Sequence, residues 1–76
     1  MEMAIVLLTF EPMMEEEALE DIKKIEGVLE VHFLYGPYDA FVKIRAGDSQ
    51  SIYDIVVDKI RSVNGIKSTM TCFIAD

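Results

Sequence analysis

The sequence offers few residues that could hold a metal ion or form a covalent cross-link. Its 76 residues include one cysteine, Cys72, one histidine, His32, and no tryptophan. A lone cysteine excludes an intrachain disulfide. One cysteine and one histidine also do not supply the clustered ligands of a zinc or copper site. With a single histidine, no Ser–His–Asp or Cys–His arrangement suggests itself. We therefore expect no bound metal, no cofactor and no catalytic residue, and hence not an enzyme.

Positive charge is also scarce. Seven Lys and Arg stand against fourteen Asp and Glu, giving a formal net charge of −7, and the basic residues are scattered along the chain. Nucleic-acid binding depends on clustered Lys and Arg that neutralise phosphates, and anionic membranes attract the same residues. Direct contact with DNA, RNA or a membrane surface is therefore disfavoured.

Long apolar runs and targeting signals are missing as well. The longest apolar run, Met3 to Leu8, is far too short to span a bilayer. The N-terminus lacks the basic flank and the small-residue cleavage site of a signal peptide, and no G-x-x-x-x-G-K-[ST] phosphate loop is present. We expect a cytoplasmic protein.

Apolar residues make up 51% of the chain and follow strand-like patterns in four segments. Residues 3–10 form a short run without Gly or Pro, as in a strand buried on both faces. Residues 28–35, 40–46 and 66–75 alternate apolar and polar positions, which predicts strands with two different faces.

Two segments between these strands have helical spacing. In the first, Pro12 suits the opening turn, Glu15–Glu17 match the positive end of the helix dipole, and Gly27 supplies a stop. In the second, Asp48 is the expected N-cap and Gly65 the stop. Each helix therefore links two strands.

The element order is β-α-β-β-α-β, supported by a weak internal repeat in which Ile25–Val28 recurs as Val63–Ile66. Two strand–helix–strand halves give a four-stranded antiparallel sheet with both helices on one face, the α+β ferredoxin-like arrangement. We expect a single domain over residues 1–76.

Two helices can cover only one face of such a sheet. The first strand is apolar on both faces, and we expect Phe41 and Phe73 on the uncovered face. Soluble monomers rarely expose so large an apolar patch, so we expect the sheets of two copies to pair face to face. The alternative is that polar residues assigned to the same face suffice for a monomer, namely Lys43, Arg45, Thr69 and Thr71.

Two polar clusters are the best candidates for a binding site. The segment Gly36–Asp39 is a turn with an aromatic ring, a carboxylate and free backbone N–H groups, and Ser68–Thr71 carries hydroxyls on the last strand. Each has an ordinary structural explanation, as a hairpin turn and as an edge strand. Together they suit a zwitterion, and they offer no evident nucleophile with its base. Binding without turnover is the better interpretation.

These clusters carry a resemblance to a known family. Gly36–Ile44 resembles the Gly-x-Tyr-Asp segment of the effector-binding (RAM) domain of the leucine-responsive regulator/AsnC family (Lrp/AsnC), and Val63–Thr71 resembles its turn into a Thr-containing strand. The resemblance covers essentially the whole chain. Family members usually carry an N-terminal helix-turn-helix domain that is missing here, so the resemblance implies a stand-alone sensor domain.

The resemblance also implies how such a domain works. Dimers formed through the sheets assemble into rings, commonly octamers, and an amino-acid effector binds where dimers meet. Asp39 would receive the ligand's ammonium group, Leu34 would be an apolar wall, and output would pass to full-length regulators of the same family. The implied ligand-binding residues are Leu34, Gly36, Tyr38, Asp39, Ser68, Thr69 and Thr71. Pro37 departs from the family's usual polar residue in this turn.

Other functions of the same topology stay open. An ACT-like domain also binds amino acids, usually to regulate a fused enzyme, and a small dimeric monooxygenase would use a cavity between helices and sheet. A polar His or Asn aimed into such a cavity would favour the monooxygenase. An oligomer without a ligand is a further alternative.

Overall fold

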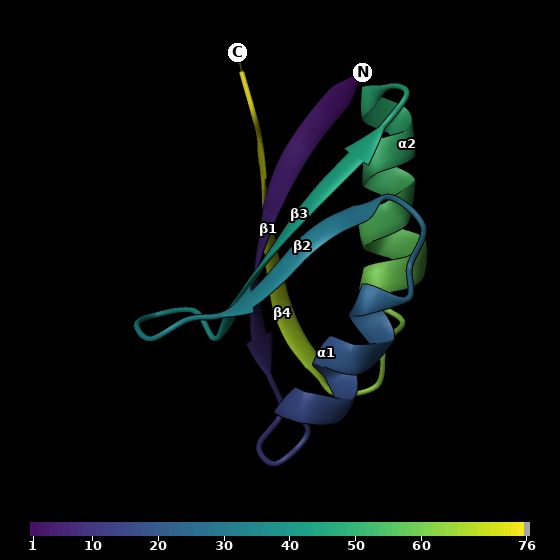
Figure 1. Cartoon of the computed structure of the whole chain (residues 1–76). Helices are drawn as coiled ribbons and strands as arrows, with labels where there is room; N and C mark the ends of the chain where they lie inside the picture. The colour runs from purple at the N-terminus through teal and green to yellow at the C-terminus, as the bar shows by residue number, and fades with distance from the viewer. Residues whose placement is uncertain (76) are drawn as a thin grey trace.

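The computed structural model describes residues 1–75 (Figure 1). Its elements in chain order are β1 (Glu2–Phe10), α1 (Glu15–Lys23), β2 (Val28–Phe33), β3 (Ala40–Ala46), α2 (Ser49–Asp54), the π-helical turn η1 (Ile55–Ile60) and β4 (Ile66–Phe73). The strands pair antiparallel in the order β2-β3-β1-β4. Both helical segments lie on the same side of the sheet in Figure 1. The predicted ferredoxin-like arrangement is confirmed.

The core lies between the helices and one face of the sheet. Alternate residues of the two central strands and one stripe of each helix are inaccessible to solvent, among them Val6, Leu8, Ile22, Val42, Ile44, Ile52 and Ile60. Among residues 1–75, no polar or charged residue is buried as a whole. No His or Asn in that range points into this layer, so the feature that would favour a monooxygenase is missing there.

The helix starts agree only in part with the sequence. Asp48 caps α2 as predicted, since its Oδ1 accepts a hydrogen bond from the Ser51 N–H at 2.8 Å. Hydrogen bonding to Ser51, first through its side chain and then through this N–H, lowers the pKa of the Asp48 carboxyl. Pro12 does not lie in the first turn of α1, which begins at Glu15. Met13 has a left-handed backbone with φ of 70°, and this separates Pro12 from the helix.

The second helix is continuous in outline but changes its winding. After Asp54 the chain adopts π-helical turns through Ile60, and the Arg61 N–H bonds the Val56 carbonyl at 2.9 Å, five residues back. Sequence periodicity did not reveal this wider turn. Arg61 directly follows this turn.

The internal repeat has a clear structural meaning. Gly27 and Gly65 have φ of +99° and +101°, a left-handed conformation that only glycine adopts easily. The Gly27 carbonyl accepts a hydrogen bond from Arg45 N–H at 2.9 Å, and the Gly65 carbonyl accepts one from Glu11 N–H at 2.8 Å. Each glycine thus ties the turn after a helix to the end of a neighbouring strand.

The strand register corrects the assignment of faces on β4. Phe73 pairs with buried Ala4 and Thr71 with buried Val6, so Phe73, Thr71 and Thr69 belong to the helix-covered side. The expectation that they lie on the open face is wrong. Period-two alternation shows which residues share a face, but it does not show which of the two faces meets the helices. On β4 burial does not mark that face either, because β4 is an edge strand that the helices cover poorly. Phe73 remains 49% exposed, so no fully buried row marks the inner face.

The open face of the sheet is nevertheless apolar at its centre. Phe41 lies there as predicted, pairing with Leu7. The same row geometry places a contiguous apolar group on this face: Met3, Ile5, Leu7, Phe41, Met70 and Cys72. On β2, His32 stacks on the Phe41 ring with a centroid distance of 5.6 Å, and its Nε2 lies 3.1 Å from Glu30 Oε1. We call the apolar group the open-face patch; it consists of Met3, Ile5, Leu7, Phe41, Met70 and Cys72.

Candidate effector site

Asp39 is held firmly at the base of the β2–β3 hairpin. Its Oδ2 accepts a hydrogen bond from the Phe10 N–H at 2.9 Å, its own N–H bonds the Leu8 carbonyl at 2.8 Å, and its carbonyl accepts from Leu34 N–H at 2.8 Å. Phe10 is the residue at which the pairing of β1 with β4 shifts register. The carboxylate therefore satisfies a backbone donor at an irregular point of the sheet.

A groove of about 540 Å³ adjoins Asp39, between the hairpin and the start of α1. Phe10 and Phe33 meet edge to face within its wall, with ring centroids 6.3 Å apart. We call it the acidic groove because three of its lining residues, Glu15, Glu16 and Asp39, carry carboxylates. The full lining is Phe10, Pro12, Glu15, Glu16, Phe33, Leu34, Tyr35 and Asp39. Two of the predicted site residues, Leu34 and Asp39, thus share one cavity.

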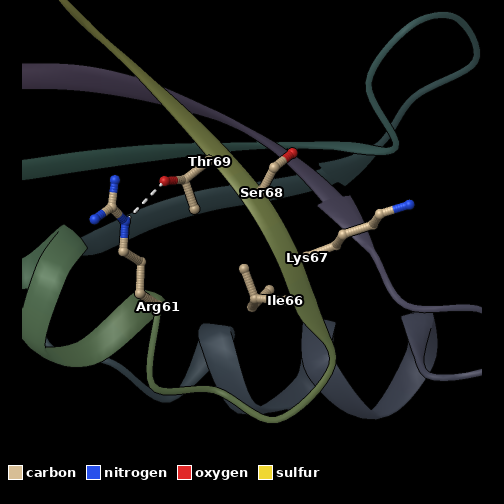
Figure 2. Close-up of a pocket in the computed structure, with 5 residues that line it drawn as sticks. All are labelled: Arg61, Ile66, Lys67, Ser68 and Thr69. Atoms are coloured by element: carbon tan, nitrogen blue, oxygen red, sulfur yellow. Dashed lines mark hydrogen bonds between the residues drawn. The ribbon is translucent and has the colours of Figure 1, made fainter.

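A second cavity, of about 410 Å³, lies at the β4 edge and is lined by Arg61, Ile66, Lys67, Ser68 and Thr69 (Figure 2). The Arg61 Nε–H donates to Thr69 Oγ1 at 3.1 Å, and Figure 2 shows these two side chains pointing toward each other. Ser68 Oγ is hydrogen bonded to Thr9 Oγ1. We call this cavity the hydroxyl pocket. Figure 2 shows Lys67 and Ser68 pointing away from this pair, so Arg61 and Thr69 are the donors that suit a carboxylate here.

Arg61 is the main residue that the sequence did not single out. Its position in the last turn before the Asn64-Gly65 turn carries no motif, and it directly follows the π-helical turn. Thr71 lies two residues further along β4, on the same side of the sheet as Thr69. It lines a smaller groove of about 240 Å³ beside Tyr53 and Phe73, and this groove shares Arg61 and Thr69 with the hydroxyl pocket.

The remaining predicted residues point elsewhere. The Tyr38 hydroxyl donates to Met70 Sδ at 3.2 Å, so the ring reaches toward β4 and the open-face patch. Gly36 lies in the exposed hairpin with φ of +137°, and a Cβ there would meet nothing within 4 Å. The glycine is therefore explained by its left-handed backbone. It is not explained by a close contact with another of residues 1–75.

Comparison with known proteins places this geometry in a family. The sequence matches the Lrp/AsnC ligand binding domain over residues 3–76. The chain belongs to the Lrp/AsnC family of ligand-binding domains. The resemblance carried by Gly36–Ile44 and Val63–Thr71 is therefore confirmed at the level of the family.

Relatives of this Lrp/AsnC domain occur in longer chains and as similar small structures. It is 37% identical over 71 residues to an uncharacterized HTH-type transcriptional regulator of Pyrococcus furiosus, a match over 90% of this chain and 47% of the regulator. The crystal structure of TTHA0845 from Thermus thermophilus superposes with a TM-score of 0.94 at 29% identity, covering 100% of this chain and 95% of that one. The chain spans about half the length of the curated relatives that it matches first.

One match of a different kind is shorter. The homocitrate synthase of Sulfolobus acidocaldarius is 48% identical over 50 residues, which is 66% of this chain and 10% of that enzyme. The match concerns a small part of the enzyme's length.

Within this Lrp/AsnC domain, the predicted site residues therefore do not converge on one cavity. Leu34 and Asp39 line the acidic groove, whereas Ser68 and Thr69 line the hydroxyl pocket on the other side of β1. Within residues 1–75, no group of three or more His, Cys, Asp or Glu side chains is arranged to hold a metal ion, and no helix has the length and apolarity needed to cross a membrane.

Proposed function

We propose that this Lrp/AsnC domain senses an amino acid, which binds at contacts between copies of the chain and modulates transcriptional regulators that share its interfaces. The family assignment and the HTH-type relative support a regulatory role. The observation that carries the ligand class is Asp39, whose carboxylate is fixed by the Phe10 N–H beside a small-molecule-sized groove. No turnover is part of this proposal.

Association through the open-face patch is the first step. Ile5 and Leu7 lie on the central strand β1, and Phe41 and Met70 flank Leu7 on either side. A second copy packed against this surface would remove a contiguous apolar area from water, the main driving force for association. The charged residues Lys43 and Glu30, 3.8 Å apart on the same face, then lie toward the β2 margin of the contact.

The separation of the two cavities supports ligand binding between copies. Adjacent strands lie about 4.8 Å apart, so β3 and β4 are roughly 10 Å apart across β1. The ammonium and carboxylate of one amino acid are much closer together than that. A ligand whose ammonium binds Asp39 of one copy would therefore bind its carboxylate to Arg61 and Thr69 of a neighbouring copy. Such a ligand stabilises the assembly by mass action.

A thermal-shift screen of the twenty amino acids tests the proposal. A ligand at about 100 times its Kd stabilises the folded state by about 2.7 kcal/mol, a readily measured rise in Tm. We expect at least one amino acid to raise Tm in the wild type and to lose this effect in Asp39→Asn. Asp58→Asn, at an exposed position of η1, is the charge-matched control. If no amino acid raises Tm, the proposal fails.

A second candidate output is regulation of an enzyme, as in the ACT-like alternative. The local match to a homocitrate synthase favours it, since part of that enzyme resembles this domain. Mixing the chain with an HTH-type relative and, separately, with such an enzyme distinguishes the two. Effector-dependent co-sedimentation with the regulator supports transcriptional output, and co-sedimentation with the enzyme alone supports the second candidate.

A further inference from the structure

Arg61 is a cation whose charge no carboxylate among residues 1–75 balances. Its Nε–H donates to Thr69 Oγ1 at 3.1 Å, and within that range its side chain makes no other hydrogen bond. None of the ion pairs there includes Arg61, although the chain carries fourteen acidic residues and a net charge of −7. The N–H groups on the two terminal guanidinium nitrogens are therefore available to an acceptor.

Two threonines beside Arg61 add further donors. Thr69 Oγ1 accepts from Arg61, so its own O–H is free to donate, and the Thr71 hydroxyl lies on the same side of the sheet. Figure 2 shows the guanidinium beside Thr69, with its terminal nitrogens directed away from Ile66 and Lys67. A guanidinium flanked by hydroxyls suits a carboxylate, because each of these groups offers a proton and the carboxylate only accepts.

The smaller groove that contains Arg61, Thr69 and Thr71 continues between the second helix and β4, and we call it the α2–β4 groove. Its other lining residues are aromatic or aliphatic: Tyr53, Val56, Val57 and Phe73. Tyr53 and Phe73 are 59% and 49% exposed, so two rings face water beside the groove. Cavities for drug-sized ligands measure roughly 300–1,000 Å³. The α2–β4 groove, at about 240 Å³, suits a smaller molecule with an apolar part.

We infer that the α2–β4 groove binds small monocarboxylates with an apolar tail, within a single copy of the chain. The carboxylate accepts from the terminal N–H groups of Arg61 and from the Thr69 and Thr71 hydroxyls, and the tail packs against the apolar wall. None of the lining residues is acidic, so the groove has no partner for an ammonium group. This site differs from the proposed effector site, which needs Asp39 and a second copy, although both use Arg61.

Matched probes separate the charge from the apolar contact. They are 4-methylpentanoate, its neutral amide 4-methylpentanamide, and the shorter acid butanoate. Binding to the full chain is measured by calorimetry, with chloride as the reference anion at constant ionic strength. We expect 4-methylpentanoate to bind on the order of tenfold more tightly than the amide, as charge-assisted hydrogen bonds would give. It should also bind more tightly than butanoate, by up to about fourfold for each methylene that the groove buries.

Variants at the end of the second helix provide the matched control. Arg61→Gln and Lys59→Gln each remove one positive charge, and only Arg61 lines the groove. Arg61→Gln should weaken 4-methylpentanoate on the order of tenfold and leave the amide unchanged, whereas Lys59→Gln should change neither. Arg61→Lys keeps the charge without the planar fork, so its affinity should lie between wild type and Arg61→Gln. Val57→Thr puts a hydroxyl on the wall and should reduce the advantage of 4-methylpentanoate over butanoate.

Several results would overturn the inference. An amide that binds as tightly as the acid, or equal losses in Arg61→Gln and Lys59→Gln, would show that Arg61 does not bind the carboxylate. Equal affinity for butanoate and 4-methylpentanoate, or no binding of either, would show that the groove holds no apolar tail. Asp39→Asn should leave 4-methylpentanoate binding unchanged, and a loss there would show that the acid needs the effector site. If every amino acid fails in the thermal-shift screen, the proposed function fails while the carboxylate result stands.

Discussion

Asp39 has two roles in this structure, and replacing it should therefore change both stability and binding. The hydrogen bond from Phe10 N–H to Asp39 Oδ2, at 2.9 Å and partly buried, is charge-assisted. Hydrogen bonds to charged groups contribute about 1.5–3 kcal/mol, and Asp39→Ala also leaves the Phe10 donor unpaired. We expect Asp39→Ala to lower the free energy of unfolding by about 2 kcal/mol.

The size of the domain makes this loss easy to measure. For 60–100 residues, 1 kcal/mol corresponds to about 4–8 °C in Tm, so Asp39→Ala should lower Tm by roughly 8–16 °C. Asp39→Asn keeps an acceptor oxygen at the same place and should lose less than half as much stability.

Chemical denaturation at fixed protein concentration is the appropriate assay, because association makes Tm depend on concentration. Asp58→Ala, an exposed carboxylate on η1, is the control and should change the unfolding free energy by less than about 0.5 kcal/mol. If Asp39→Ala is as stable as Asp58→Ala, the structural role argued for the Phe10 contact is refuted.

Three further predictions concern the fold. Leu8→Ala should cost about 2–5 kcal/mol in chemical denaturation, since Leu8 is fully buried between the sheet and the helices; a cost below 1 kcal/mol would contradict that placement. Gly65→Ala should destabilise by more than about 1 kcal/mol, because Gly65 has φ of +101° and a Cβ would lie 2.9 Å from Met14 Cβ; an increase in Tm would refute this. Asp48 has a lowered pKa when folded, so its contribution to stability is present at neutral pH and is lost as the pH falls through that pKa. The destabilisation caused by Asp48→Ala should therefore shrink in acid, and a pH-independent difference would contradict the cap.

The fold was largely predictable because its determinants are local. The alternation in Ala40–Ala46 and the Asp48 cap each act within a few residues, and both appear in the structure as expected. Their agreement along the chain selects one topology. The glycines at 27 and 65 lie in the turns after the helices and do not end them, because the helical segments already end at Lys23 and Ile60.

The features that were missed depend on contacts between distant segments. Nothing local shows that Phe73 faces the helices, because that follows from the register between β4 and β1. Asp39 was identified as a ligand-binding residue, but its bond to Phe10 spans the hairpin and β1. Arg61 donates to Thr69 across the turn into β4, and it follows a π-helical turn that apolar spacing does not encode. For the same reason, the division of the predicted site between two cavities could not be foreseen.

Sedimentation equilibrium with and without an amino acid tests the central claim, that copies of this chain associate through the open-face patch and hold the effector between them. At micromolar concentration the wild type should sediment as a dimer or a larger species, and the amino acid that raises Tm should shift the distribution toward larger mass. Leu7→Asp, at the centre of the patch, should sediment as a monomer. A wild-type monomer whose mass does not change with that amino acid would contradict the account.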